Sequence, residues 1–214
     1  MTHSLHRRGS IEDLHEDYVV LTVPNRDNGR VSEESQEKLR QIWEIVSRHA
    51  KDLVNFGNGI SKKPMEELTK NKSRTAAMLV FKDRESLKSC LQEIKDREFG
   101  ISIVISGLYD HTEALCSDLG TSPHTVEHSL GIHGNTERLP DEDVLEITTM
   151  CGHAVVSPHL VTHLVDRINK GKTTHEKAAE ELSRMCTCGI FNPYRAEKIL
   201  RKLTATATLC GVLE

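Results

Sequence analysis

The sequence predicts an α/β fold in which a mainly parallel four-stranded sheet with flanking helices is followed by a helical C-terminal region. Between residues 17 and 140, apolar and β-branched segments alternate with segments of helical periodicity. The connections between them are short, which favours right-handed crossovers between parallel strands. After Pro140 only helical patterns remain. We therefore expect an N-terminal arm at residues 1–16, an α/β domain at 17–140, and a helical, cysteine-bearing region at 141–214 packed on it.

The first strand and helix of the α/β domain have the clearest patterns. Residues 18–23 (YVVLTV) form a nearly continuous apolar run, typical of a strand buried on both faces. Ser32 is a helix N-cap, and Glu33 and Glu34 supply the acidic first turn that a helix dipole favours. Leu39 and the apolar residues after it recur on one helical face.

The remaining elements follow in chain order. The α/β domain is expected to continue with a strand at 76–81, a helix at 84–98, a strand at 101–106, a short helix at 111–119 and a fourth strand within 125–132. Residues 53–74 are mostly polar and are expected to form a loop with a short helix. The C-terminal region is expected to form helices at 141–149, 158–170, 174–185 and 193–203.

Composition excludes several classes of function. The formal net charge is −4, and basic residues are not clustered, so the basic face of a nucleic-acid-binding protein is missing. No apolar run approaches the roughly 20 residues of a membrane span. The N-terminus has basic residues but no apolar segment behind them, so we expect a cytoplasmic protein. Thiols stay reduced in that compartment, and six cysteines then point to metal binding or reactivity.

Three cysteines lie in two short segments between predicted helices. Cys151 is followed by Gly152, and Cys186 and Cys188 are followed by Gly189. Each segment leads into a helix with a cap and a proline, at Ser157-Pro158 and Asn192-Pro193.

This arrangement is suited to binding a metal through thiolates. Helix N-termini carry partial positive charge and unpaired N–H groups, which favour thiolates and the sulfides of a cluster. Glycines allow the backbone to approach closely. We therefore expect Cys151, Cys186 and Cys188 to be metal ligands, with Gly152, Gly189 and Asn192 supporting the cofactor. The alternative is that these cysteines are small buried residues at helix ends.

The metal and its chemistry stay open at this point. Thiolates are the usual ligands of iron–sulfur clusters, so we favour a cluster of the 4Fe-4S type, in a redox or Lewis-acid role. Structural zinc is the alternative, and it needs a fourth ligand. Cys116, His153 or an exogenous group could supply that ligand in either case. A zinc-stabilised interaction module and a metal-free enzyme, with Cys151 as nucleophile and His153 as base, are the other hypotheses.

Further polar residues are candidates for catalysis. His153 lies two residues from Cys151. Asp110 and His133 follow two of the predicted strands, and ligands of parallel sheets bind at the carboxyl ends of strands. Ordinary turn chemistry is the alternative explanation for Asp110 and His133.

Three segments resemble an uncharacterised protein family of anaerobic bacteria and archaea. They are residues 129–132 (SLGI), 145–153 (LEITTMCGH) and 186–193 (CTCGIFNP). That family has glycine where this chain has Ala154. The resemblance implies an anaerobic, cluster-related setting but no particular reaction. A redox protein or a small-molecule substrate is then the expected partner, and a homodimer is an open alternative.

Overall fold

The computed structural model describes residues 4–59, 61–70 and 75–210, without the side chains of 206–210. Contacts divide the chain into two compact units. The α/β unit comprises residues 14–126 together with 187–190. The helical unit comprises residues 1–13, 127–186 and 191–214.

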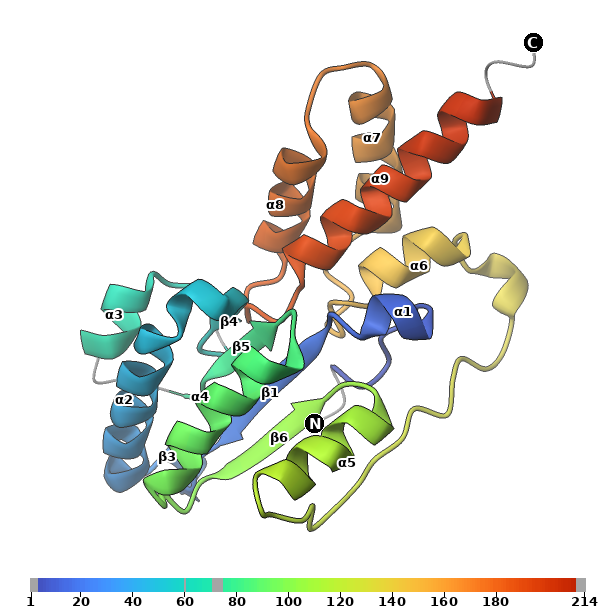
Figure 1. Cartoon of the computed structure of the whole chain (residues 1–214). Coiled ribbons are helices and arrows are strands. Elements are labelled where there is room, and N and C mark those ends of the chain that lie inside the picture. The colour runs from blue at the N-terminus through green and yellow to red at the C-terminus, as the bar shows by residue number, and fades with distance from the viewer. Residues whose placement is uncertain (1–3, 60, 71–74, 211–214) are drawn as a thin grey trace. The chain divides into compact units, whose positions relative to one another are not determined.

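The α/β unit is built on a four-stranded sheet in the order β4-β5-β1-β6 (Figure 1). Its strands are β1 (Tyr18–Val23), β4 (Leu53–Gly57), β5 (Met78–Phe81) and β6 (Ser102–Ser106). Every neighbouring pair is antiparallel. The predicted mainly parallel sheet is therefore wrong.

The error has a topological cause. Helix α2 (Glu33–Arg48) joins β1 to β4, and helix α4 (Arg84–Asp96) joins β5 to β6. Strands β5 and β6 both run antiparallel to β1, so they run parallel to each other, with β1 inserted between them. The pair β1 and β4 is likewise separated by β5. This is the βαββαβ arrangement of ferredoxin-like folds, a description of topology that carries no function.

One strand was assigned to the wrong place. The sheet contains β4, which falls in the segment that its polar composition marked as a loop; Asn55 of this strand is buried. The predicted strand within 125–132 is wrong, because these residues are irregular and exposed.

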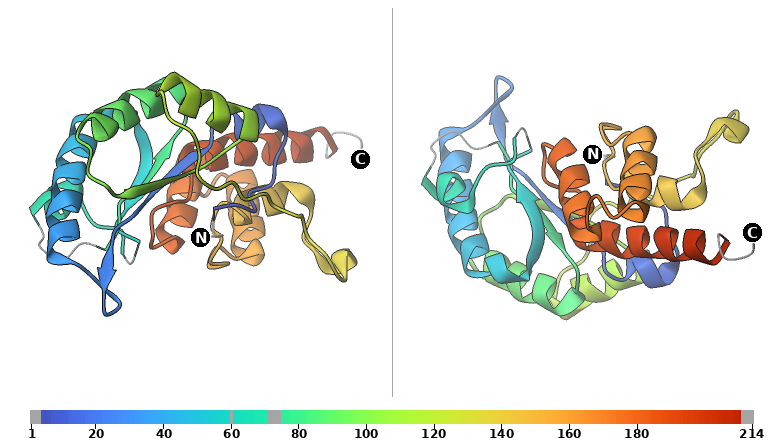
Figure 2. Two further views of the ribbon diagram at one scale, coloured as in Figure 1. Left: turned by 90° about the horizontal axis from the view of Figure 1, so that it is seen from below. Right: turned by 90° about the horizontal axis from the view of Figure 1, so that it is seen from above.

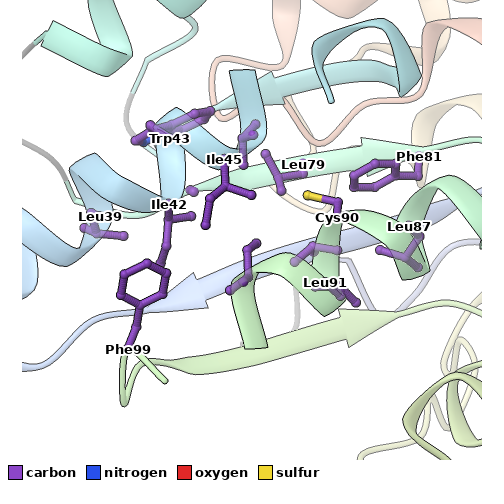
Figure 3. Close-up of a cluster of buried hydrophobic side chains, with 14 of the residues drawn as sticks. Leu39, Ile42, Trp43, Ile45, Leu79, Phe81, Leu87, Cys90, Leu91 and Phe99 are labelled. Atoms are coloured by element: carbon purple, nitrogen blue, oxygen red, sulfur yellow. The ribbon is translucent and has the colours of Figure 1, made fainter. Parts of the chain in front are cut away.

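The core of the α/β unit lies between the sheet and the helices α2 and α4. Ser32 caps α2 by accepting a bond from the Ser35 amide, as its sequence predicts. Side chains from both helices meet the strands in one cluster (Figure 3). The members labelled there include Leu39, Ile42, Trp43, Ile45, Leu79, Phe81, Leu87, Cys90, Leu91 and Phe99. The Cys90 thiol belongs to this cluster, and its burial raises its pKa to about 12.

Helix α5 (Tyr109–Asp118) follows β6 and continues the row formed by α2 and α4, as Figures 1 and 2 show. The smaller elements of the chain are α1 (Ile11–Leu14), β2 (Arg26–Asp27), β3 (Arg30–Val31), η1 (Ala50–Asp52), α3 (Met65–Lys70) and η2 (Thr136–Arg138). None of the described helices is both long and apolar enough to cross a membrane.

The helical unit contains α6 (Glu142–Thr148), α7 (Pro158–Asn169), α8 (His175–Met185) and α9 (Pro193–Cys210). Helices α7, α8 and α9 pack side by side (Figures 1 and 2). Ser157 caps α7 through its side-chain oxygen, which confirms the predicted cap, and the side-chain oxygen of Thr174 caps α8.

The N-terminal segment belongs to the helical unit. Arg7 donates to the carbonyl of Met150, and the Arg8 amide donates to Thr149. The Arg8 guanidinium also forms a two-bond ion pair with Glu142. These bonds fix the segment against the turn that carries Cys151.

Candidate thiolate site

The thiols of Cys151 and Cys186 lie together inside the helical unit. Cys151 follows the end of α6, and Cys186 is the C-cap residue of α8. The exposed fraction is 2% for Cys151 and 0% for Cys186. Neither forms a disulfide. The two side chains are hydrogen-bonded, and this bond together with burial raises the pKa of the Cys151 thiol. The sequence analysis predicted one site of Cys151, Cys186 and Cys188, and the structure brings the first two of these thiols into contact.

Backbone N–H groups also reach the Cys151 sulfur. The amides of His153 and Val155 donate to it and partly offset the rise in its pKa. They belong to the turn after Cys151 and not to a helix N-terminus. Helices α6 and α8 present their carbonyl ends here, which carry partial negative charge. We expected helix N-termini to stabilise the thiolates. The amides of a turn take this place at Cys151, and such amides bond thiolate and sulfide in metal sites.

The turn after Cys151 requires a left-handed residue. Ala154 has φ +55°, and its amide donates to the Cys151 carbonyl at 3.1 Å. Left-handed backbone is costly for alanine and nearly free for glycine.

Replacing Ala154 by glycine is therefore expected to raise the free energy of unfolding by about 0.5–1 kcal/mol. Urea unfolding of the variant protein measures it. Ala205→Gly, within the right-handed helix α9, is the matched control and should lower stability by up to about 1 kcal/mol. An equal loss in both variants would contradict the assigned turn.

Cys188 is buried in the α/β unit, two residues along the chain from Cys186. Its segment, residues 187–190, crosses the end of β4 at very short range. A Cβ added to Gly57 would lie 2.3 Å from the Cys188 carbonyl oxygen. A Cβ added to Gly189 would lie 2.2 Å from the Phe56 carbonyl oxygen, and Gly189 has φ +79°. Glycine is required on both sides of this crossing, and sequence reasoning found only Gly189.

Asn192 is fully buried and caps α9. Its side-chain oxygen accepts a bond from the Arg195 amide at 3.0 Å. This confirms the predicted cap. Asn192 therefore fixes the start of the helix that follows the cysteine segment.

The other predicted site residues lie elsewhere. His153 and Gly152 are exposed in the turn after Cys151. His133 is exposed in the irregular segment of the helical unit, whereas Asp110 is exposed in the first turn of α5 in the α/β unit. Cys116 is half-buried on α5.

Among the residues that the structure describes, three or more histidine, cysteine or acidic side chains are nowhere grouped closely enough to hold a metal ion. The assembled part of the candidate site is thus the pair Cys151 and Cys186.

Comparison with known proteins adds no relationship. No protein-family model matches the chain, and neither does a curated protein or a solved structure. The site must therefore be interpreted from its own residues.

A second group of polar residues was missed by sequence reasoning. Tyr18, His15 and His111 gather at one edge of the sheet in the α/β unit, next to the predicted Asp110. The signal was weak, because His111 is far in sequence from His15 and Tyr18 and only the fold brings it beside them.

Proposed function

We propose that the protein binds an iron–sulfur cluster, of the 4Fe-4S type, through Cys151, Cys186 and Cys188. The observation that carries the proposal is the contact between the Cys151 and Cys186 thiols, which come from the ends of two separate helices.

The surroundings of the pair support a thiolate centre. Removing the protons from two thiols in contact would leave two like charges in a buried place, which is costly without a cation. A metal centre supplies that cation, and the amides of His153 and Val155 supply hydrogen bonds to sulfur. The assembled pair therefore supplies two of the thiolates that a metal–thiolate group needs.

Cys188 is the proposed third ligand because it follows Cys186 by two residues in the sequence. The fourth iron position is left to Cys116, His153 or an external molecule. When bound, a cluster with an external fourth position would supply Lewis acidity, and a fully ligated cluster would supply electron transfer.

The test is anaerobic purification of the whole chain followed by iron, zinc and acid-labile sulfide analysis. Wild-type protein is expected to contain iron and sulfide in equal amounts. Cys151→Ala, Cys186→Ala and Cys188→Ala are each expected to lose most of both. Cys90→Ala is the matched control, because Cys90 is equally buried but lies in the hydrophobic core of the α/β unit.

The outcomes separate the alternatives. Zinc without sulfide would assign the same thiols to a structural zinc site, and a chelator should then unfold the protein. Metal that persists in both Cys151→Ala and Cys186→Ala would contradict the ligand assignment. Metal-free protein with one rapidly alkylated thiol would favour the Cys151–His153 enzyme instead.

The proposal includes a cellular setting. A cluster held by free thiols suits a reducing cytoplasm, and a redox protein or a small-molecule substrate would be its partner. Neither partner class is specified further by the residues at the site.

A further inference from the structure

A second site lies at the end of the sheet where β1 begins and its neighbours β5 and β6 end. Tyr18 pairs with Phe81, and Val19 pairs with Ser106. Strands β5 and β6 therefore both end beside the start of β1, and the helices α4 and α5 both begin at this end of the sheet. Two helix N-termini, each with partial positive charge, are brought to one place, and the Asp83 side chain caps that of α4.

A surface depression of about 430 Å³ opens at this end of the sheet. It is lined by His15, Glu16, Tyr18, Lys82, Asp83, Arg84, His111 and Ala114, all of the α/β unit. Its basic and polar side chains come from the start of β1, the end of β5 and the helices α4 and α5, so the fold and not one local segment assembles it.

The Tyr18 hydroxyl and the His111 ring are the most tightly fixed groups in the depression. The hydroxyl oxygen lies 2.6 Å from His111 Nδ1. Tyr18 is 2% exposed, and burial raises the pKa of its hydroxyl. Nε2, the other ring nitrogen of His111, is a donor in the tautomer in which Nδ1 accepts from Tyr18, and both nitrogens are donors when the ring is protonated. Gly107 makes this packing possible, because a Cβ there would lie 2.9 Å from the Tyr18 ring.

The surroundings of His111 are positive. The His15 ring lies 4.3 Å away between centroids. The pKa of His111 is lowered by burial, by His15 and by Arg84, and only Asp110 opposes this. An anion in the depression would be attracted by these same groups.

Arg84 has donor capacity to spare. One of its terminal nitrogens donates to Asp118 at 2.5 Å. Its side chain is 30% exposed and lines the depression, so its guanidinium can reach a ligand there through a terminal nitrogen, whereas its Nε is shielded from solvent. The Asp83 carboxylate is already engaged in capping α4 through the Ser86 amide at 2.7 Å.

The first turn of α5 is also open. Its N-cap residue is Leu108, which offers no side-chain acceptor to the helix amides. Helix α4, by contrast, has its cap in Asp83.

We propose that this depression binds the phosphate or carboxylate group of a small-molecule ligand, with Arg84, Lys82 and His111 as donors. Glu16 is the one lining carboxylate that opposes such an anion without a capping role. The site is separate from the cysteines and does not depend on the cluster proposal.

The test is a titration of the whole chain with inorganic phosphate, and separately with acetate, followed by NMR of the histidine ring protons. Phosphate or acetate is expected to shift the His111 and His15 signals and to raise the pKa of His111. Arg84→Gln is expected to weaken binding at least tenfold. Arg40→Gln is the matched control, because Arg40 pairs with Glu37 and Glu44 on the exposed face of α2 and should leave binding unchanged within twofold.

Glu16→Gln tests the proposal in the opposite direction. It removes the opposing charge and is expected to tighten anion binding severalfold. Weaker binding in this variant would overturn the proposal, as would equal affinities of Arg84→Gln and Arg40→Gln. Absence of any histidine shift with both anions would overturn it as well. The stronger of the two anions identifies the ligand as a phosphate ester or a carboxylate.

Discussion

Gly189→Ala is expected to lower the free energy of unfolding by roughly 3–5 kcal/mol. Two costs combine at this position. The left-handed backbone at φ +79° is unfavourable for alanine. The new Cβ would also lie 2.2 Å from the Phe56 carbonyl oxygen, a backbone atom of β4 that cannot rotate away. Urea unfolding of the whole chain measures the loss.

Two other glycines separate these costs. Gly29 has φ +78° but open space around its missing Cβ, so Gly29→Ala should cost only about 1 kcal/mol. Gly57→Ala carries the clash with Cys188 without a left-handed backbone and should cost about 2–3 kcal/mol. A Gly189→Ala variant no less stable than Gly29→Ala would contradict the close crossing of the segment 187–190 over β4.

Arg195→Met is expected to lower the free energy of unfolding of the helical unit by roughly 3–5 kcal/mol. Arg195 is 1% exposed; its guanidinium donates to the Arg8 carbonyl at 2.5 Å and lies 3.4 Å from the Glu146 carboxylate. Loss of the guanidinium leaves a half-buried carboxylate and a carbonyl without this donor, and an uncompensated buried charge is expensive. Thermal and urea unfolding measure the change.

Arg8→Met is the control for this substitution. The Arg8 guanidinium also pairs with a glutamate of α6, Glu142. Both side chains are partly exposed, Arg8 at 35% and Glu142 at 56%. Exposed ion pairs are worth little, so the loss should stay below about 1 kcal/mol. The double variant Arg195→Met/Glu146→Gln should recover part of the loss of Arg195→Met, because the uncompensated carboxylate is gone.

The Arg195→Met deficit should also depend on pH. Burial raises the pKa of Glu146, and Arg195 holds that rise in check. Without Arg195 the pKa rises further, so the folded variant binds a proton that the unfolded chain releases. Its stability is then greatest below the ordinary glutamate pKa of about 4.3 and falls as pH rises through the folded value. The deficit relative to wild type should grow between about pH 4 and pH 7, and it should not grow in the double variant, which lacks this carboxylate.

The local elements of the fold were predictable because their signals are local. A continuous apolar run marks β1, and side-chain caps mark α2, α7 and α8. The pairing of strands was not predictable in the same way. Alternating strands and helices are compatible with adjacent parallel strands and with strands separated by a third one. The polar residue Asn55 interrupts the apolar pattern of β4, so this strand was not predicted. Its presence decides between the two strand arrangements.

The candidate site shows the same limit. Glycines and helix caps around Cys151 and Cys186 indicated two turns, and these two cysteines do meet. The partners of the cysteine segment on β4 could not be deduced, because Gly57 is remote in sequence and has its role only through the crossing. The depression around His111 was missed for the same reason.

The strand order also determines when the α/β unit can fold during synthesis. Its central strand β1 emerges first, but it pairs only with residues that start at Met78 and at Ser102. Once residues 78–81 have emerged, the ribosome-bound chain can pair β1 with β5 and β5 with β4, but the other edge of β1 stays unpaired until β6 emerges. Contacts so distant in sequence slow folding, and they prolong the time during which an edge of β1 is unpaired and prone to aggregation. A nascent chain stalled before Ser106 should therefore be a better chaperone substrate than one released a few residues later.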